Sequence, residues 1–144
     1  MKHKCIHILI VILLSYTSYS QTFPGGVKPF EDRGSVESKL PPAPKVNLPD
    51  VHQDDNFYKV AIDISVNGIQ LKSAYCSFKN NKLVSMTYDF DASDRDKIIS
   101  ILKTKYKSIK CGGDKVTNCY RGNNMKIEVA GTYMNYYAEN QSEL

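Results

Sequence analysis

The chain has 144 residues, of which 42% are hydrophobic and 24% are charged, a balance that suits one small globular domain. The formal net charge of +4 is too weak to predict a nucleic-acid partner, and we expect none. No apolar run reaches the roughly 20 residues of a membrane-spanning helix, so no stable membrane anchor is expected. Composition therefore argues against a fibrous, wholly disordered or membrane-spanning chain and leaves the chemistry open.

The first 20 residues have the pattern of a secretory signal peptide. Lys2 and Lys4 provide a cationic start, residues 6–14 form a nearly uninterrupted apolar run, and small residues lead up to Ser20. Such a run spans only about 13 Å as a helix, which is less than half of a hydrocarbon core of about 30 Å. We therefore expect residues 1–20 to be removed by cleavage after Ser20, which leaves a secreted or periplasmic chain.

Proline is confined to one segment of the chain. All six prolines lie between residues 24 and 49, and the composition changes near Asp50. Because proline fixes φ and lacks an N–H donor, the segment favours extended polyproline II over helix or central strand. We interpret residues 21–50 as an extended linker before a folded domain at residues 51–144. A proline-rich ligand for an aromatic groove is the alternative.

Three alternating segments follow, joined by two tight turns. Asn67-Gly68 is a strong signal for a type I′ hairpin, and its register sets Val60 opposite Tyr75. Asn80-Asn81 predicts a second turn, so the three segments form an antiparallel meander. The two registers place one apolar set on a shared face: Tyr58, Val60, Ile62, Ile64, Leu71, Tyr75, Val84, Met86, Tyr88 and Phe90.

A helix and further strands complete the predicted domain. Ser93 suits the N-cap of a helix with Asp96 three residues on, and an apolar stripe follows at three- and four-residue steps. Residues 116–121 and 125–130 alternate as strands do, and residues 132–137 suit a last one. The order β-β-β-α-β-β, possibly with a sixth strand, predicts an α+β fold with one helix packed on one face of an antiparallel sheet of five or six strands.

Four lysines gather at the end of the predicted helix: Lys103, Lys105, Lys107 and Lys110. Cations suit the negative end of the helix dipole, and a solvated helix face needs charge. We therefore interpret them as a solvent-exposed set, with docking on an anionic surface as the functional alternative.

Three cysteines follow the predicted signal peptide. Cys111 and Cys119 lie eight positions apart across a Gly-Gly-Asp loop, which predicts a disulfide in an oxidising compartment. Cys76 is left over as a buried small residue, an alternative partner for Cys119, or an intermolecular bridge. The spacing does not suit zinc, because His52 is the only histidine after residue 20. We therefore predict no metal site and no cofactor.

Groups suited to catalysis are sparse. A Cys-His or Ser-His-Asp arrangement would depend on His52, beside the linker. Two groups of neighbouring aspartates suggest a glycosidase pair or a calcium loop, but the second group lacks the glycine and the distal glutamate of an EF-hand. These groups consist of Asp54 and Asp55, and of Asp89, Asp91, Asp94 and Asp96. We expect a chain that is not an enzyme and keep a small Asp- or Cys-dependent hydrolase as the lowest alternative.

The second face of the predicted sheet is more apolar than a solvated face should be. It collects Phe57, Ala61, Ala74, Cys76, Phe78 and Leu83. Such a face needs a cover, which the end of the linker, the tyrosine-rich C-terminal segment or another protein can supply.

The sequence thus favours an exported, non-enzymatic module that binds a protein partner through Phe57, Ala74, Phe78 and Leu83. Inhibition, immunity-like protection and an interaction at the cell envelope are its candidate roles. A structural protein that self-associates, as a homodimer through this face or through Cys76, is the alternative.

Overall fold

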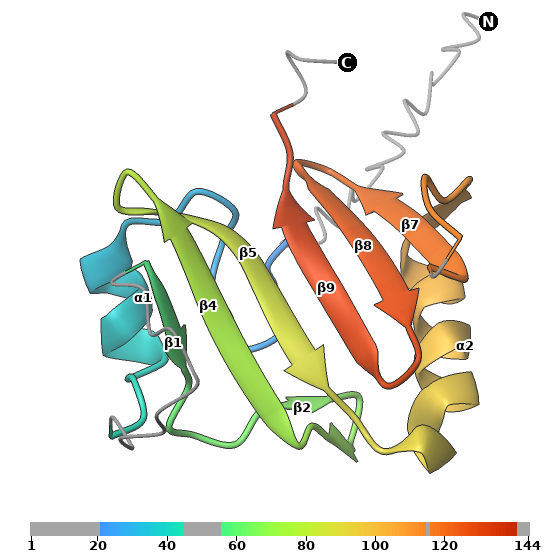
Figure 1. The fold of residues 1–144 in the computed structure, drawn as a ribbon, viewed down its shortest axis with the longest axis horizontal. Helices are drawn as coiled ribbons and strands as arrows, with labels where there is room; N and C mark the ends of the chain where they lie inside the picture. The colour runs from blue at the N-terminus through green and yellow to red at the C-terminus, as the bar shows by residue number, and fades with distance from the viewer. Residues whose placement is uncertain (1–20, 45–55, 115, 141–144) are drawn as a thin grey trace, which may run out of the picture.

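The fold is α+β, as predicted, and is built on one large antiparallel sheet (Figure 1). The computed structural model describes residues 21–44, 56–114 and 116–140, so the predicted signal peptide lies outside the described residues. Seven strands form the sheet in the order β1-β4-β5-β9-β8-β7-β6. A separate hairpin and two α-helices accompany it.

The strands of the sheet are β1 (Phe57–Lys59), β4 (Ser73–Lys79), β5 (Lys82–Asp89), β6 (Lys107–Ile109), β7 (Asn118–Gly122), β8 (Met125–Ala130) and β9 (Tyr133–Ala138). The hairpin consists of β2 (Ser65–Val66) and β3 (Ile69–Gln70). The helices are α1 (Arg33–Lys39) and α2 (Arg95–Lys105), and a short 3-10 helix, η1 (Ala92–Asp94), precedes α2.

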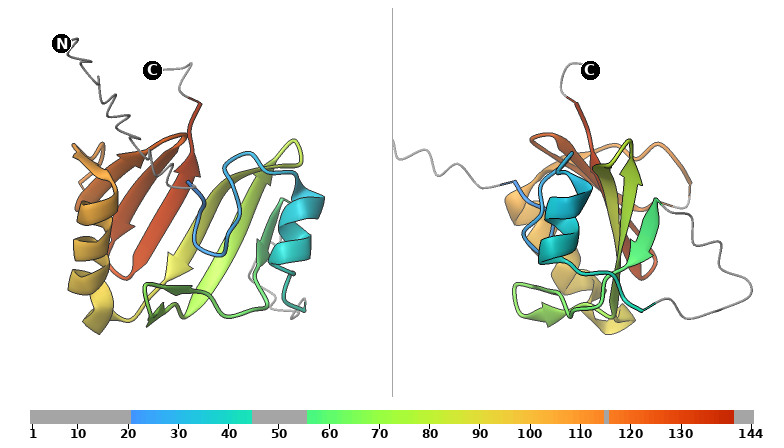
Figure 2. Two further views of the ribbon diagram at one scale, coloured as in Figure 1. Left: turned by 180° about the vertical axis from the view of Figure 1, so that it is seen from behind. Right: turned by 90° about the vertical axis from the view of Figure 1, so that its left-hand side faces the viewer.

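Among the described residues, the covering segments lie on one face of the sheet only. Figure 2 shows, from behind, that α2, the β2–β3 hairpin and residues 21–44 all lie on the same side of the strands. Helix α2 contributes the buried side chains of Ile98 and Leu102, as its apolar stripe predicted. The core therefore lies in a single layer between the sheet and these covering segments.

Residues 21–44 are not the extended linker that the sequence predicted. Four apolar side chains of this segment are 0–1% exposed and belong to the core: Phe23, Val27, Val36 and Leu40. Residues 31–40 contain no proline, so nothing in this stretch interrupts the backbone hydrogen bonds of α1. The folded unit thus begins well before residue 51, while residues 45–50 of the predicted linker lie outside the described residues.

Hydrogen bonds to the sheet hold this N-terminal segment in place. The backbone N–H of Phe30 donates to the Leu83 carbonyl at 2.9 Å, and the Leu83 N–H donates to the Glu31 carbonyl at 2.9 Å. The buried Tyr88 hydroxyl donates to the carbonyl of Pro24 at 2.7 Å. Because these bonds satisfy polar groups in a dry layer, residues 21–44 act as part of the domain.

Both predicted tight turns are present. Val66 pairs with Ile69 around Asn67-Gly68, and Lys79 pairs with Lys82 around the second turn. All four turn residues have positive φ, a conformation that asparagine and glycine tolerate best. The first hairpin detaches from the main sheet, however, and Lys59 rather than Val60 lies opposite Tyr75.

A β-bulge between β4 and β5 changes which side chains of these two strands share a face, compared with the predicted meander. The register of β4 and β5 shifts between Ser77 and Phe78, so that Cys76 lies opposite Met86 and Ala74 opposite Tyr88. One extra residue in a strand moves every later side chain to the other face relative to its partner. The side chains of β4 that the sequence assigned to the second face therefore join the core.

The sheet has seven strands rather than the predicted five or six, because Lys107, which the sequence predicts at the end of the helix, belongs to the additional strand β6. Helix α2 ends at Lys105, and Lys107 already belongs to β6, where it pairs with Arg121. The predicted strand over residues 125–130 is confirmed with the same bounds as β8.

Candidate functional site

Three of the four predicted binding residues lie in the core. Ala74, Phe78 and Leu83 are 0–5% exposed, so the predicted binding face is wrong at these positions. The bulge in the β4–β5 pair turns them toward residues 21–44, which supply the cover that this apolar set required. Only Phe57 stays on the opposite face, half-buried, with its ring stacked on Tyr75 at 5.4 Å between centroids.

The predicted disulfide between Cys111 and Cys119 is present, with 5.4 Å between the two Cα atoms. It joins the end of β6 to β7 and indicates an oxidising compartment outside the cytoplasm. Cys76 is free and fully buried, and burial raises the pKa of its thiol to about 11. Such a thiol is neither accessible for an intermolecular bridge nor ionised as a nucleophile at neutral pH.

Three carboxylates of the second acidic group, those of Asp89, Asp91 and Asp94, have a structural partner. Asp91 caps η1 by accepting from the Ser93 backbone N–H, in place of the predicted Ser93 cap, and its carboxylate also pairs with Lys72 at 3.3 Å. Asp89 accepts from the Ser73 hydroxyl. Within residues 21–44, 56–114 and 116–140, no three His, Cys, Asp or Glu side chains are grouped to hold a metal. His52, Asp54 and Asp55 lie outside the described residues.

The uncovered face is the first candidate site. Among the described residues, no helix or loop crosses the front of the central strands in Figure 1. Strand pairing identifies the side chains of this face as Phe57, Lys59, Ser73, Tyr75, Ser77, Lys79, Lys82, Ser85, Thr87, Asp89, Lys107, Ile109, Cys119, Arg121, Lys126, Glu128, Ala130, Tyr133, Asn135 and Tyr137.

Aromatic rings stand out on this otherwise polar face. Tyr133 is 51% exposed and Tyr137 is 36% exposed, and both come from β9 in the middle of the sheet. Between them along the strand, Met134 and Tyr136 point into the core instead. The alternation of β9 is thus the sequence signal that could have identified these tyrosines as a solvent-facing pair.

A partly buried ion pair fixes one of these rings. Lys126 contacts the Glu128 carboxylate at 2.5 Å, and both side chains are no more than 26% exposed. Burial raises the pKa of Tyr137, as do the Glu128 charge and the hydrogen bond that its hydroxyl makes with Glu128. The Tyr137 ring is therefore held in place by its neighbours.

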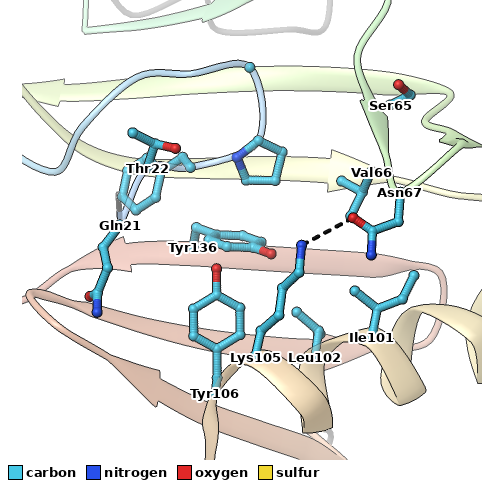
Figure 3. A pocket seen from close by; sticks show the side chains of 13 residues that line it. Gln21, Thr22, Ser65, Val66, Asn67, Ile101, Leu102, Lys105, Tyr106 and Tyr136 are labelled. Atoms are coloured by element: carbon cyan, nitrogen blue, oxygen red, sulfur yellow. Dashed lines mark hydrogen bonds between the residues drawn. The ribbon is translucent and has the colours of Figure 1, made fainter. Parts of the chain in front are cut away.

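A cleft on the covered side is the second candidate site (Figure 3). It has a volume of about 270 Å³ and lies between residues 21–25, the β2–β3 hairpin and α2. Lys105 extends from the end of α2 toward the hairpin, and its Nζ donates to Asn67 Oδ1 at 3.0 Å. The cleft therefore joins three segments that are far apart in sequence.

The inner end of the cleft contains two tyrosines. Burial raises the pKa of Tyr106, and a hydrogen bond with the Tyr136 hydroxyl partly opposes that rise. Tyr136 itself is 2% exposed and packs edge-on against Phe23 at 5.7 Å between ring centroids. Both hydroxyls thus stay protonated at neutral pH and hydrogen-bond to each other.

Comparisons of the chain with protein-family models, with curated proteins and with solved structures gave no match. Within the described residues, the helices are too short or too polar to span a bilayer.

Proposed function

We propose that this chain is an exported, non-enzymatic module that binds an acidic patch of a partner protein through its uncovered face. The observation that carries the proposal is the exposure of Tyr133 and Tyr137 in the middle of that face. Tyrosine supplies a large contact area at low entropic cost and is enriched at the centres of protein interfaces.

Rigidity of the face supports this function. The Phe57 and Tyr75 rings stack almost parallel, and Tyr137 is hydrogen-bonded to Glu128. Because these rings lie on a hydrogen-bonded sheet, binding would immobilise few additional groups. A surface whose aromatic side chains are already ordered loses less entropy on association than a flexible one does.

The charges of the face favour an acidic partner. Six basic side chains belong to it, against two acidic ones: Lys59, Lys79, Lys82, Lys107, Arg121 and Lys126, with Asp89 and Glu128. Lys126, Arg121 and Lys82 form ion pairs with Glu128, Glu139 and Asp32, respectively. Lys59, Lys79 and Lys107 then remain against Asp89. The remaining positive charge would steer an acidic surface toward the face and would be screened by salt.

The experiment captures proteins from the extracytoplasmic fraction of the source cells on three immobilised versions of the chain. These are the native chain, a Tyr133→Ser/Tyr137→Ser variant, and an Ile62→Ser control. Ile62 is 46% exposed and does not belong to the uncovered face, so its replacement tests apolar exposure alone. We expect one partner to be retained by the native and control chains, lost by the tyrosine variant, and released by salt at about 0.5 M.

Three outcomes would contradict the proposal. Equal capture by all three chains would mean that the tyrosines do not contact the partner. Capture by none of them would remove the basis for a binding face. A native chain that sediments as a dimer, with a monomeric tyrosine variant, would assign the face to self-association instead.

A further inference from the structure

We propose that the cleft beside α2 binds a small organic carboxylate with a compact apolar body. The cleft opens on the side of the sheet opposite to the uncovered face, so this inference is independent of the protein-binding function proposed above.

Charge indicates an anionic ligand. Lys105 is the only charged residue among the 13 that line the cleft, and none of the 13 is acidic. Its ammonium group donates to the amide oxygen of Asn67, which is a neutral acceptor. The positive charge therefore remains uncompensated within the cleft and leaves further N–H donors for a carboxylate.

The position of Lys105 offsets the negative end of the α2 helix dipole, which would otherwise disfavour an anion. The end of α2 presents free carbonyl groups, whose partial negative charge repels anions. Figure 3 shows the lysine stem directed away from the helix toward the hairpin, so the charge lies beside Asn67. A carboxylate held there would be separated from the helix end.

The walls account for the apolar body of the ligand. Phe23, Pro24, Val66, Ile101 and Leu102 supply apolar surface from three different segments. Aromatic or aliphatic groups gain free energy when such walls remove them from water.

Size limits the ligand to a compact molecule. The cleft volume is about 270 Å³. It lies just below the range of about 300–1,000 Å³ that is typical of sites for drug-sized ligands. A single ring with a short carboxylate arm therefore fits the chemistry and the size, whereas a long acyl chain does not.

The test compares three probes of similar shape on the full chain: phenylacetate, the neutral phenylacetamide and the cationic phenethylamine. Binding is followed by nuclear magnetic resonance titration of the backbone amides. We expect saturable shifts at Asn67, Lys105 and Tyr106 with phenylacetate, and binding weaker by roughly tenfold or more with the other two probes.

Replacing Lys105 or Lys103 tests which lysine charge contributes to phenylacetate binding. Lys105→Met keeps most of the stem but removes the ammonium group, so phenylacetate binding should weaken by roughly tenfold or more. Lys103→Met removes a charge that is also exposed, on the same helix but outside the cleft, and should change binding by less than about threefold. Val66→Phe narrows the cleft and should weaken phenylacetate and phenylacetamide alike.

Clear results would overturn the inference. These are equal affinity for the three probes, equal effects of the Lys103 and Lys105 replacements, or no saturable binding up to about 10 mM phenylacetate. The Tyr133→Ser/Tyr137→Ser chain should bind phenylacetate as the native chain does. That control separates failure of this site from failure of the protein-binding face.

Discussion

Cys76 lies directly opposite Met86 across the β4–β5 pair, and both side chains are fully buried. The bulge near the Asn80-Asn81 turn produces this pairing, because an unbroken register from that turn would set Cys76 opposite Ser85 instead. The consequence extends along the whole of β4. Ala74 and Phe78 become core residues, and Tyr75 becomes part of the uncovered face.

The two phenylalanines on opposite faces should differ sharply in their effect on stability. Phe78→Ala removes a buried ring and should lower the free energy of unfolding by about 3–5 kcal/mol. Phe57→Ala removes a half-buried ring stacked on Tyr75 and should lower it by no more than about 1.5 kcal/mol. Urea unfolding at neutral pH measures both values. Equal losses would contradict the assignment of the two residues to different faces.

Residues 21–44 should contribute to the stability of the whole domain. Leu40 is 1% exposed, so Leu40→Ala should lower the free energy of unfolding by about 2–5 kcal/mol in urea denaturation. Ser38→Ala, two residues away on the exposed side of α1, serves as the control and should change it by less than about 0.5 kcal/mol. If both replacements were neutral, the segment would behave as the extended linker that the sequence predicted.

The disulfide should stabilise the domain by restricting the unfolded chain. Closing a loop with a sequence separation of eight residues corresponds to about 2.5 kcal/mol of chain entropy. The Cys111→Ser/Cys119→Ser chain should therefore unfold with a free energy lower by about that amount. A reducing agent should lower the native chain to the same level and leave the variant unchanged. A reducing agent without effect on the native chain would mean that the bond does not form in solution.

Alkaline pH should destabilise the folded chain. Burial raises the pKa of Cys76 to about 11 and raises that of Tyr88 well above its usual range, so the unfolded chain loses these protons first. Where the folded state retains a proton that the unfolded state has lost, the free energy of unfolding falls by up to about 1.4 kcal/mol per pH unit per group. The fall should begin near pH 8.5 for the thiol and near pH 10 for the phenol.

Urea unfolding between pH 7 and about pH 11 measures this dependence. Cys76→Ala should remove the part of the fall that begins near pH 8.5 and leave the steeper fall near pH 10. A free energy of unfolding that stays constant up to pH 11 would contradict the burial of these groups.

The sequence by itself determined the local features of the fold. The turns at Asn67-Gly68 and Asn80-Asn81 follow from which residues tolerate positive φ, and the disulfide between Cys111 and Cys119 from short spacing. The apolar stripe of α2 and the alternation of β8 likewise need only neighbouring residues. These features are local, so no distant packing was required to predict them.

The candidate sites depended on the tertiary structure. The sequence predicted that Phe57 lies on the second face, and it does. Whether Ala74, Phe78 and Leu83 face solvent depends on one bulged residue, and the cover comes from residues 21–44. Because side chains alternate with a period of two, a shift by one residue reverses a face, and only packing against the cover selects the register. Lys105 forms part of a cleft solely because the hairpin and the N-terminal segment, distant in sequence, fold beside α2.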